Sequence, residues 1–411
     1  MEYYNTINET YTNALQSQHL HYKFKIELLD HWETSLGEIV RDMSISSAGQ
    51  LNINYQQGTR RSCTLSILDV DNNYIPNEDS LFWYNRKFKL YIGLVVNDDI
   101  YWFSQGVFLT QNADYEEETR ILNIDAIDKF GIFDGTLGTG RLKTNYKYPV
   151  GINIASVIKD TLALDLGNGL PYDPIKPHMY IGFNTTLTQA EIEISENAYI
   201  GEFFITLAES YVADVFYDEN GYFNFSLIYD ENITAKYEFM AHQWDFTKNF
   251  YCDCNTNYNF DSLNTVTVYT NADDTAKTTT NDNGETESTP IVNVSYTAYN
   301  NNAQSQARIS SIGIRRAESI EIPYVEKTVE TMTDRCRQVA ENALIKNNIM
   351  TMTKNFTSVI IPHLDVNRTI GVPDKNGTFE TYIVQSITIS LDGSQMSISA
   401  TNIKHLKGVT V

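Results

Sequence analysis

The clearest structural signal in this sequence is a helix followed by two alternating strands near its end. Apolar side chains recur at steps of three and four through residues 329–343, which is the spacing of one buried helix face. Residues 383–391 and 396–401 then alternate between apolar and small polar side chains, as strands do when they bury one face. Asp392 and Gly393 lie between the two runs, and Gly accepts the positive φ of a tight turn. The pattern predicts an antiparallel hairpin with a two-residue turn.

Residues 20–149 predict an all-β region. Its candidate strands are 22–29, 42–47, 50–55, 62–68, 88–95, 101–110 and 120–127. Short strands at this spacing favour a barrel or a sandwich, and we expect a first antiparallel β-barrel here. Residues 1–19 form an N-terminal arm with a short polar helix that carries Ile7, Tyr11 and Leu15 on one face. A docking arm and a frayed terminus both fit this segment.

Residues 150–235 change in character and predict a small α/β domain. Residues 151–164 fit a helix, and residues 200–211 fit a second helix with an uninterrupted apolar face. Two strands, 212–217 and 222–227, follow across a turn that ends in Asn and Gly.

Residues 236–411 return to β-structure and predict a second barrel. Its expected strands are 264–270, 291–296 and 309–315 together with the closing hairpin, and a helix over 326–347 precedes that hairpin. The inserted stretch 271–290 is almost entirely Asp, Asn, Thr and Glu, so it cannot bury enough apolar area to offset its ordering entropy. We expect an exposed, mobile loop that contacts a neighbouring chain or nothing.

The charge balance excludes some partners. The chain has 411 residues, with 52 acidic and 30 basic side chains and a net charge of −22. This argues against a protein held to duplex DNA by phosphate contacts or to an anionic membrane surface. The four cysteines are scattered and imply no disulfide framework. The first residues do not read as a signal peptide, and no apolar run is long enough to span a membrane.

Two loops partly match phosphate and calcium motifs. Residues 135–141 approach a phosphate loop, but Arg141 and Leu142 stand where the motif needs Lys and then Ser or Thr, so a linker fits better. Asp69, Asp71 and Asn73 match the start of a calcium loop, but later positions lack the turning Gly and the closing Glu, so an ordinary turn fits better.

Two further clusters partly match known kinds of site. Cys252 and Cys254 with His242 would make an incomplete metal site, and alternation along a strand explains the cysteines better. Glu191, Glu193 and Glu196 would supply paired carboxylates for sugar hydrolysis, but the first two alternate with Ile and fit the wet face of a strand. The sequence therefore assigns no catalytic, cofactor-binding or metal residue, and no cofactor.

Several segments in order along the chain carry a family resemblance. They are the Asp- and Asn-rich turn 69–76 with Trp83 after it, the helix and hairpin around Asp218-Glu219-Asn220-Gly221, Pro362-His363-Leu364-Asp365-Val366, and residues 382–389. Together they resemble the central hub proteins of phage tail baseplates, including the late-control D proteins and the N-terminal hub part of tail-associated lysins. The resemblance spans most of residues 20–403.

The resemblance implies a mainly β fold with α+β parts, in which two tail-tube-like antiparallel barrels flank the small α/β domain. It implies a structural virion protein with no enzymatic role, found in the phage tail baseplate or tip and assembled in the host cytoplasm. Three chains would place six barrels in a ring that adapts a sixfold tail tube to a threefold spike and opens or closes a channel for DNA ejection. Partners would be the homotrimer, a tail tube or distal tail protein, a spike, tip or fibre protein, and the tape measure protein and DNA in the channel, with no membrane binding.

Two expectations complete this interpretation. Since the sequence ends soon after the last hairpin, we expect no lysin domain; the alternative function is a virion or secreted glycan-binding protein or a cell-wall hydrolase. If a channel exists, acidic residues of barrel strands and turns should line it and repel DNA, with Glu116, Glu117 and Glu118 as candidates.

Overall fold

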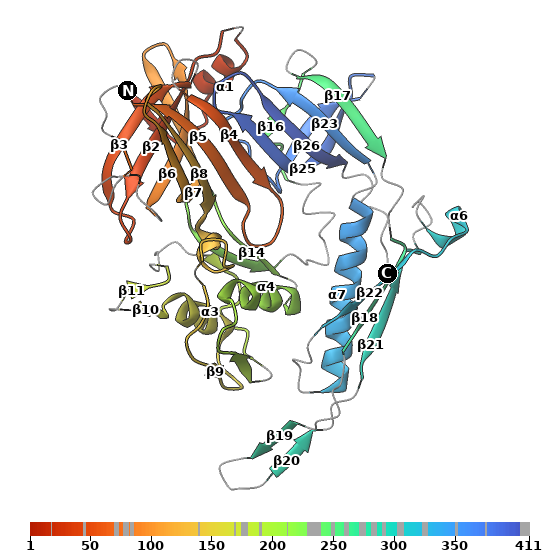
Figure 1. Ribbon diagram of the computed structural model, residues 1–411. Helices are drawn as coiled ribbons and strands as arrows, with labels where there is room; N and C mark the ends of the chain where they lie inside the picture. Colours follow the sequence, from red (N-terminus) through yellow and green to blue (C-terminus); the bar gives the residue numbers. More distant parts are fainter. Residues whose placement is uncertain are drawn as a thin grey trace.

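The computed structural model describes residues 1–17, 19–43, 47–69, 74–76, 82, 86–138, 140–167, 170–173, 180–188, 191–211, 213–227, 240–247, 251–258, 263–270, 277–280, 286–289, 293–301, 308–322, 328–349, 352–374 and 376–402. Within these residues the fold is mainly β. A large curved sheet forms the upper part of the molecule in Figure 1, and two smaller α/β units lie below it.

The large sheet has 14 strands that come from both ends of the described chain. Its first half contains β1 (Glu2–Tyr4), β2 (Tyr22–Leu29), β3 (Ser35–Asp42), β4 (Ser47–Asn54), β5 (Arg61–Leu68), β6 (Lys87–Val96), β7 (Asp99–Glu116) and β8 (Ile121–Asp128). Its second half contains β16 (Trp244–Asp245), β17 (Tyr251–Tyr258), β23 (Met352–Ser358), β24 (Thr369–Pro373), β25 (Phe379–Ser390) and β26 (Met396–Asn402).

The two halves repeat one strand order. Hydrogen-bonded neighbours run β4-β5-β8-β7-β6 in the first half and β17-β23-β26-β25-β24 in the second, with every pair antiparallel. The halves differ at the end, since β2 joins β6 antiparallel and β16 joins β24 parallel. They are joined because β25 also pairs with β4. The two strand sets therefore share one order, while closure of each into a barrel stays a prediction.

Alternation along the strands creates one shared core. Leu122, Ile124 and Ala126 of β8 and Ile398 and Ala400 of β26 all point inward and are at most 2% exposed. The intervening polar residues face outward. A single hydrophobic cluster therefore holds both halves together.

The closing hairpin is present, but its turn differs from the prediction. The last paired residues of the hairpin are Ser390 and Gln395, so four residues and not two form the loop. Leu391 leaves the hairpin because its N–H donates to the Gly49 carbonyl (3.0 Å), and its side chain is fully buried. Gly393 has the expected positive φ of 80°.

The N-terminal helix is docked on the large sheet. Helix α1 (Glu9–Leu15) starts at Asn8, whose side chain accepts from the Tyr11 N–H (2.9 Å). Tyr11 and Leu15 are fully buried in the shared core, whereas Ile7 is 58% exposed. The docking-arm interpretation is therefore the one the structure supports.

An α/β unit lies below the first half of the sheet, around α3 and α4 in Figure 1. It contains η1 (Lys129–Ile132), β9 (Tyr146–Tyr148), α3 (Ile154–Leu162), β10 (Asp165–Gly167), β11 (Leu170–Pro171), β12 (Tyr180–Ile181), β13 (Ile192–Ile194), α4 (Ile200–Ser210), β14 (Ala213–Tyr217) and β15 (Phe223–Leu227). The predicted apolar face of α4 packs into a core of its own with Phe133, Phe204 and Phe223.

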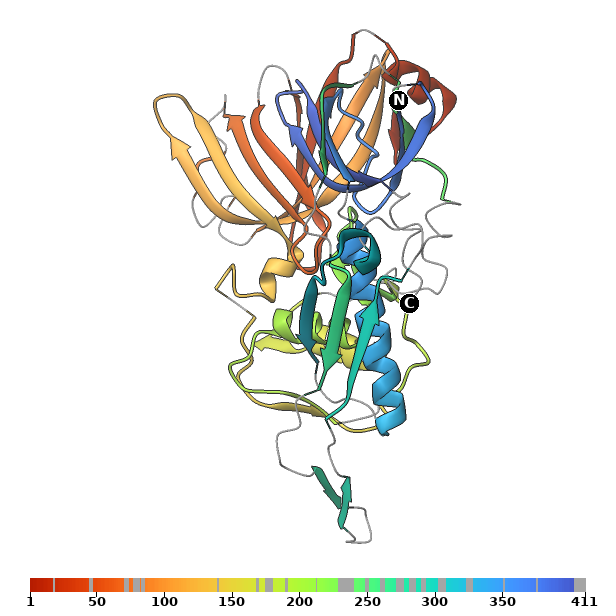
Figure 2. The ribbon, with the colours of Figure 1, turned by 90° about the vertical axis from the view of Figure 1, so that its right-hand side faces the viewer.

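A second small unit carries the long helix. Helix α7 (Val329–Ile349) packs on the sheet β21-β18-β22, formed by β21 (Ser295–Tyr299), β18 (Thr265–Tyr269) and β22 (Ala317–Glu321). We expected strands near 264–270 and 291–296 to belong to one barrel with the closing hairpin, but their sheet is separate. Residues 309–315, predicted as a strand, form helix α6 (Ile309–Ile312) and a turn at Gly313. Figure 2 shows the three-stranded sheet beside α7.

The polar insertion contains a short hairpin. Strands β19 (Lys277–Thr280) and β20 (Thr286–Thr289) pair with each other, and Figures 1 and 2 place them far below the large sheet. The other residues of 271–290 lie outside the described residues. In the part of the chain that is described, no helix has the length and apolar character that a bilayer crossing requires.

Candidate functional site: a buried polar junction

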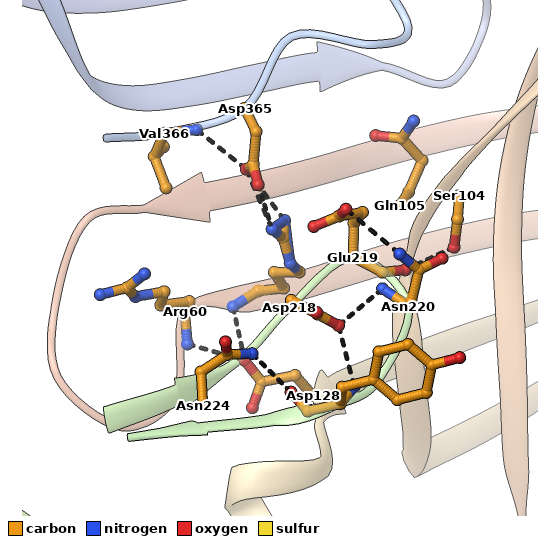
Figure 3. Close-up of polar contacts among 12 residues, drawn as sticks. Arg60, Ser104, Gln105, Asp128, Asp218, Glu219, Asn220, Asn224, Asp365 and Val366 are labelled. Carbon is orange, nitrogen blue, oxygen red and sulfur yellow. Dashed lines mark hydrogen bonds and ion pairs between the residues drawn. The ribbon is translucent and has the colours of Figure 1, made fainter. Parts of the chain in front are cut away.

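The most distinctive polar site lies where the large sheet meets the α/β unit. Two adjacent arginines, Arg60 and Arg61, stand at the start of β5, and acidic residues from three distant segments converge on them. Figure 3 shows Arg60 and two of these acidic residues, Asp128 and Asp365. Neighbouring residues of an extended chain point in opposite directions. Each guanidinium therefore reaches a different part of the molecule.

Asp128 fixes the backbone at this point. Its carboxylate accepts from the N–H groups of Arg60 (2.7 Å), Arg61 (2.9 Å) and Phe130 (3.0 Å), which ties β5 to the end of β8 and the start of η1. The side chain is buried, and this burial raises the pKa of Asp128 to about 6 although the three hydrogen bonds favour the charged form.

Arg60 binds the sheet to the α/β unit. Its Nη2 donates to both carboxylate oxygens of Asp214 on β14, each at 2.6 Å, and both side chains are less than 10% exposed. The guanidinium carbon also lies 3.5 Å from the ring centroid of Phe216. Contacts of this kind give a buried charge both a partner and a packing surface.

Arg61 binds the first half of the sheet to the second. Its Nη2 donates to both oxygens of Asp365 at 2.9 and 2.8 Å, and its side chain is 1% exposed. Asp365 belongs to the segment 362–366 that carries part of the family resemblance. In the same segment the Pro362 carbonyl accepts from Gln105 Nε2 (2.8 Å), and His363 Nδ1 bonds the Tyr11 hydroxyl (2.8 Å). This segment therefore fastens the C-terminal strands onto the N-terminal ones.

A cavity of about 170 Å³ lies beside this contact. Its lining includes Arg61, Asp365, Gln105, His363 and Glu219. Burial, together with the nearby Asp365 and Asp218 charges, raises the pKa of Glu219, and burial lowers the pKa of His363. The lining is polar, but two of its charged side chains, Arg61 and Asp365, are paired with each other.

A second buried charge cluster lies under the same sheet. Lys129 Nζ is 2.5 Å from Glu33 Oε1 and 2.6 Å from Asp173 Oδ1, and Lys87 Nζ is 3.5 and 3.6 Å from the same two atoms. All four side chains are at most 5% exposed. Two positive and two negative charges balance here, and they join β6 and the segment between β2 and β3 to the α/β unit. Desolvation lowers the pKa of Lys87 to about 8.

The junction is built to hold parts together. Its acidic groups bind buried Arg or Lys side chains or backbone N–H groups, and the described residues contain no cluster of three or more His, Cys, Asp and Glu side chains that would hold a metal ion. Buried pairs of this kind fix one relative arrangement of the segments that carry them.

The near-phosphate loop is a linker. In residues 135–141, Gly140 has a φ of 87°, and Arg141 stacks on the ring of Tyr199 at 4.4 Å. Helix α3 begins well after the loop, so it offers no helix N-terminus to a phosphate there. Thr139 itself lies outside the described residues.

The calcium-like segment is described only at its ends. Asp69 is buried, and its Oδ2 accepts from the Tyr74 N–H at 2.9 Å, as in a turn. Asp71 and Asn73, the other expected ligands, lie outside the described residues.

The cysteine and histidine candidates are not brought together. Cys252 and Cys254 are exposed on β17. His242 Nδ1 is 2.6 Å from Asp245 Oδ1, and its Nε2 is 3.0 Å from Thr381 Oγ1, so both ring nitrogens have protein partners.

The three glutamates lie on the surface. Glu193 and Glu191 lie 3.0 and 3.6 Å from Lys147 Nζ, and both glutamate side chains are at least 40% exposed. Glu196 is exposed as well. The Glu196 N–H donates to Asn145 Oδ1 (2.6 Å). Strand β13 therefore presents the wet face that its alternation predicted.

The residues of the junction were not found from the sequence. Arg60 and Asp214 are 154 positions apart, and Arg61 and Asp365 are 304 apart. Asp365 belongs to the motif 362–366, but nothing local in the sequence reveals its partner. The one local signal is the Arg-Arg pair at the start of an alternating strand, where one member of the pair must point into the core.

Comparisons with known proteins find the same fold in phage tail proteins. Neither a family model nor a curated protein matches the sequence. Among solved structures, the tail protein of Neisseria meningitidis MC58 has a TM-score of 0.57 at 9% identity, covering 94% of this chain and 99% of that one. The 43 kDa tail protein of prophage MuSo2 from Shewanella oneidensis has a TM-score of 0.56 at 10% identity, covering 93% and 99%.

A third similar structure comes from another assembly. The lidded PdpA-VgrG complex of Francisella has a TM-score of 0.52 at 12% identity, covering 96% of this chain and 54% of that one. At these identities the likeness is one of fold. The resemblance read from the sequence is confirmed at that level, since phage tail proteins share this architecture over nearly the whole chain.

Proposed function

We propose that this chain is a non-enzymatic hub protein of a phage tail. In this role three copies form a ring in which each copy supplies two sheet units, so a threefold assembly presents six similar units to a sixfold tube. The observation that carries the proposal is the repeat of one strand order in two halves that are hydrogen-bonded edge to edge. The phage tail proteins of the same fold support it.

The proposed partners follow from this role. A tail tube or distal tail protein would sit on one face of the ring and a spike, tip or fibre protein on the other, with the tape measure protein and DNA in the channel. The proposed location is the tail of the virion, after assembly in the host cytoplasm. The division into an arm (1–19), a first barrel (20–149), an α/β domain (150–235) and a second barrel (236–411) is part of the proposal.

The test is the mass and shape of the assembled protein. We expect a particle of three times the 46.9 kDa chain mass in sedimentation, and negative-stain images with a central hole and six peripheral densities. The same preparation should neither hydrolyse purified cell walls nor bind glycans. A stable monomer or dimer contradicts the hub proposal, and cell-wall hydrolysis or glycan binding would favour the alternative function.

A further inference from the structure

Strand β25 in the second half of the large sheet and its equivalent in the first half, β7, differ in the strands that pair with them. In the second half, β25 makes a bulge at Gln385 in its pairing with β26, and after this bulge its residues 386–390 pair with β4. In the first half, β7 makes a bulge at Gln111 in its pairing with β8, and the following residues 112–116 pair with β8 on one side. Among the described strands, none lies along the other side of that stretch.

The correspondence holds at the level of single hydrogen bonds. Just before its bulge, β7 pairs with β6, and the Thr110 N–H donates to the Arg86 carbonyl (3.1 Å). At the equivalent position β25 pairs with β24, and the Val384 N–H donates to the Arg368 carbonyl (2.9 Å). The register of one half therefore maps onto the other, with residues 112–116 equivalent to 386–390.

Burial differs at the equivalent positions in the way a missing neighbour would cause. Ile387 and Ile389 of β25 are at most 1% exposed with β4 beside them. Their equivalents, Ala113 and Tyr115 of β7, pack against the same core but are only half-buried. An additional strand beside β7 would cover them.

The strand equivalent to β4 is itself an edge. Strand β17 takes the place of β4 in the repeated order, and among the described strands it pairs with β23 alone. Matching the β4–β5 and β17–β23 registers makes Asn52 equivalent to Asn257. Among the described strands, residues 112–116 of β7 and strand β17 are thus both edges, and the β4–β25 contact shows how their equivalents pair.

We propose that β17 of one copy pairs antiparallel with residues 112–116 of β7 in the next copy. This repeats between chains the β4–β25 contact found within the chain. The transferred register places Asp114 opposite Asn257 of the partner subunit, where Thr388 lies opposite Asn52 within the chain with a hydrogen bond of 2.9 Å between their side chains. An Asn amide donates to a carboxylate, so the new pair is complementary.

The contact is head to tail, so each copy uses one edge as donor and the other as acceptor. This inference rests on the proposed hub function and identifies the surface through which its ring would close. It also predicts that residues 112–116 of β7 and strand β17 are covered on assembly, which removes two templates for uncontrolled strand addition.

Disulfide trapping tests the register. Asp114→Cys and Asn257→Cys are introduced together after Cys252→Ser and Cys254→Ser, and the protein is oxidised mildly. In the equivalent register Asn52 and Thr388 form a non-hydrogen-bonded pair, the closest approach of side chains across antiparallel strands. We expect a covalent species of three chain masses that reverts to single chains on reduction, and no such species from either single variant.

Two control cysteine pairs show whether a cross-link depends on the proposed register. Asn52→Cys with Thr388→Cys should cross-link within one chain, and Asp114→Cys with Thr256→Cys should not cross-link because adjacent side chains face opposite sides of a strand. A trimer whose 114–257 pair stays reduced overturns the edge pairing and leaves the hub function standing. Protein that remains a single chain at all concentrations overturns both.

A charge variant gives a second readout without cysteines. Asn257→Asp places a second carboxylate opposite Asp114 of the neighbour, and we expect about tenfold weaker assembly. Adding Asp114→Asn should restore it. Unchanged assembly in the first variant contradicts the register.

Discussion

At the scale of single residues, two adjacent arginines join three parts of the molecule. Arg60 faces Asp214 of the α/β unit, and Arg61 faces Asp365 of the C-terminal strands, because consecutive side chains leave an extended chain in opposite directions. Asp128 holds the backbone of both. Loss of a single acidic partner therefore leaves a buried charge or a buried donor without compensation.

Asp128→Asn should destabilise the protein by about 1–3 kcal/mol at pH 7. The amide would turn its NH₂ group toward a backbone N–H donor in place of one carboxylate oxygen. Urea unfolding measures the change. Asp125→Asn, on the exposed face of the same strand, is the matched control and should change the unfolding free energy by no more than about 0.5 kcal/mol. Equal effects of the two variants would show that the backbone contacts do not matter.

The pH dependence of the same variant reports the ionisation of Asp128. Burial raises the pKa of this carboxyl in the folded state to about 6 from an ordinary 3.8, so the folded protein holds the proton more tightly than the unfolded chain. The carboxyl's contribution to stability is fully present below about pH 4 and falls as pH rises through about 6. The stability gap between wild type and Asp128→Asn should therefore shrink by about 3 kcal/mol from pH 4 to pH 7. A gap that widens over this range would contradict the raised pKa.

Asp365→Ala should cost about 3 kcal/mol of unfolding free energy because it strands the buried Arg61 guanidinium. Chemical unfolding of the variant gives the value. The control is Asp334→Ala, which removes an exposed ion pair to Arg337 on α7 and should cost no more than about 0.5 kcal/mol. The double change Arg61→Met with Asp365→Leu should recover most of the loss, and failure to do so would assign the cost to something other than the unpaired charge.

At the scale of elements, periodicity predicted what local sequence controls. The helices predicted over 200–211 and 326–347 and the closing hairpin follow from apolar spacing, and the structure has α4, α7 and the hairpin at these places. The strand predicted over 309–315 is wrong: Ile309 and Ile312 lie three apart as in a helical turn, and Gly313 ends the helix in the left-handed conformation. Gly313 is therefore a helix-ending signal that the sequence itself contains.

Strand partnership could not be predicted, because it depends on residues far apart in the chain. Strands near 264–270 and 291–296 alternate as the closing hairpin does, yet they belong to the separate sheet under α7. The pairing of β4 with β25 joins residues more than 330 positions apart, and no local pattern specifies it. The same holds for the Arg61–Asp365 contact.

The polar insertion should be dispensable for stability. Thr270 and Val294 are bonded across the ends of β18 and β21 (2.9 Å), so an Asn-Gly turn can replace residues 271–293 without moving either strand. We expect the melting temperature to change by only a few degrees, and the measurement is thermal unfolding of the shortened chain. A loss well above about 1 kcal/mol would show that the insertion packs against the rest of the protein.

At the scale of the whole molecule, the charge predicts weak interaction with DNA. With 52 acidic and 30 basic residues, an assembled ring should not retain linear duplex DNA in a gel shift even at about 20 mM salt. Glu116, at the end of β7, and Glu117 and Glu118 after it are the candidates for the channel wall. Changing all three to Lys should produce salt-sensitive retention if they line the wall. Retention by the wild-type ring at low salt would contradict an acidic channel.

The contact between β4 and β25 also sets an order of events during synthesis. When the ribosome has made the first half of the sheet, one edge of β4 still lacks its partner, which is among the last described strands to be translated. The nascent chain must therefore carry an unpaired strand edge for most of its production, and its N-terminal helix must wait for His363 and its neighbours before the core can close. Long-range contacts of this kind slow folding and lengthen exposure to wrong partners. Chains that stop before β25 should therefore aggregate.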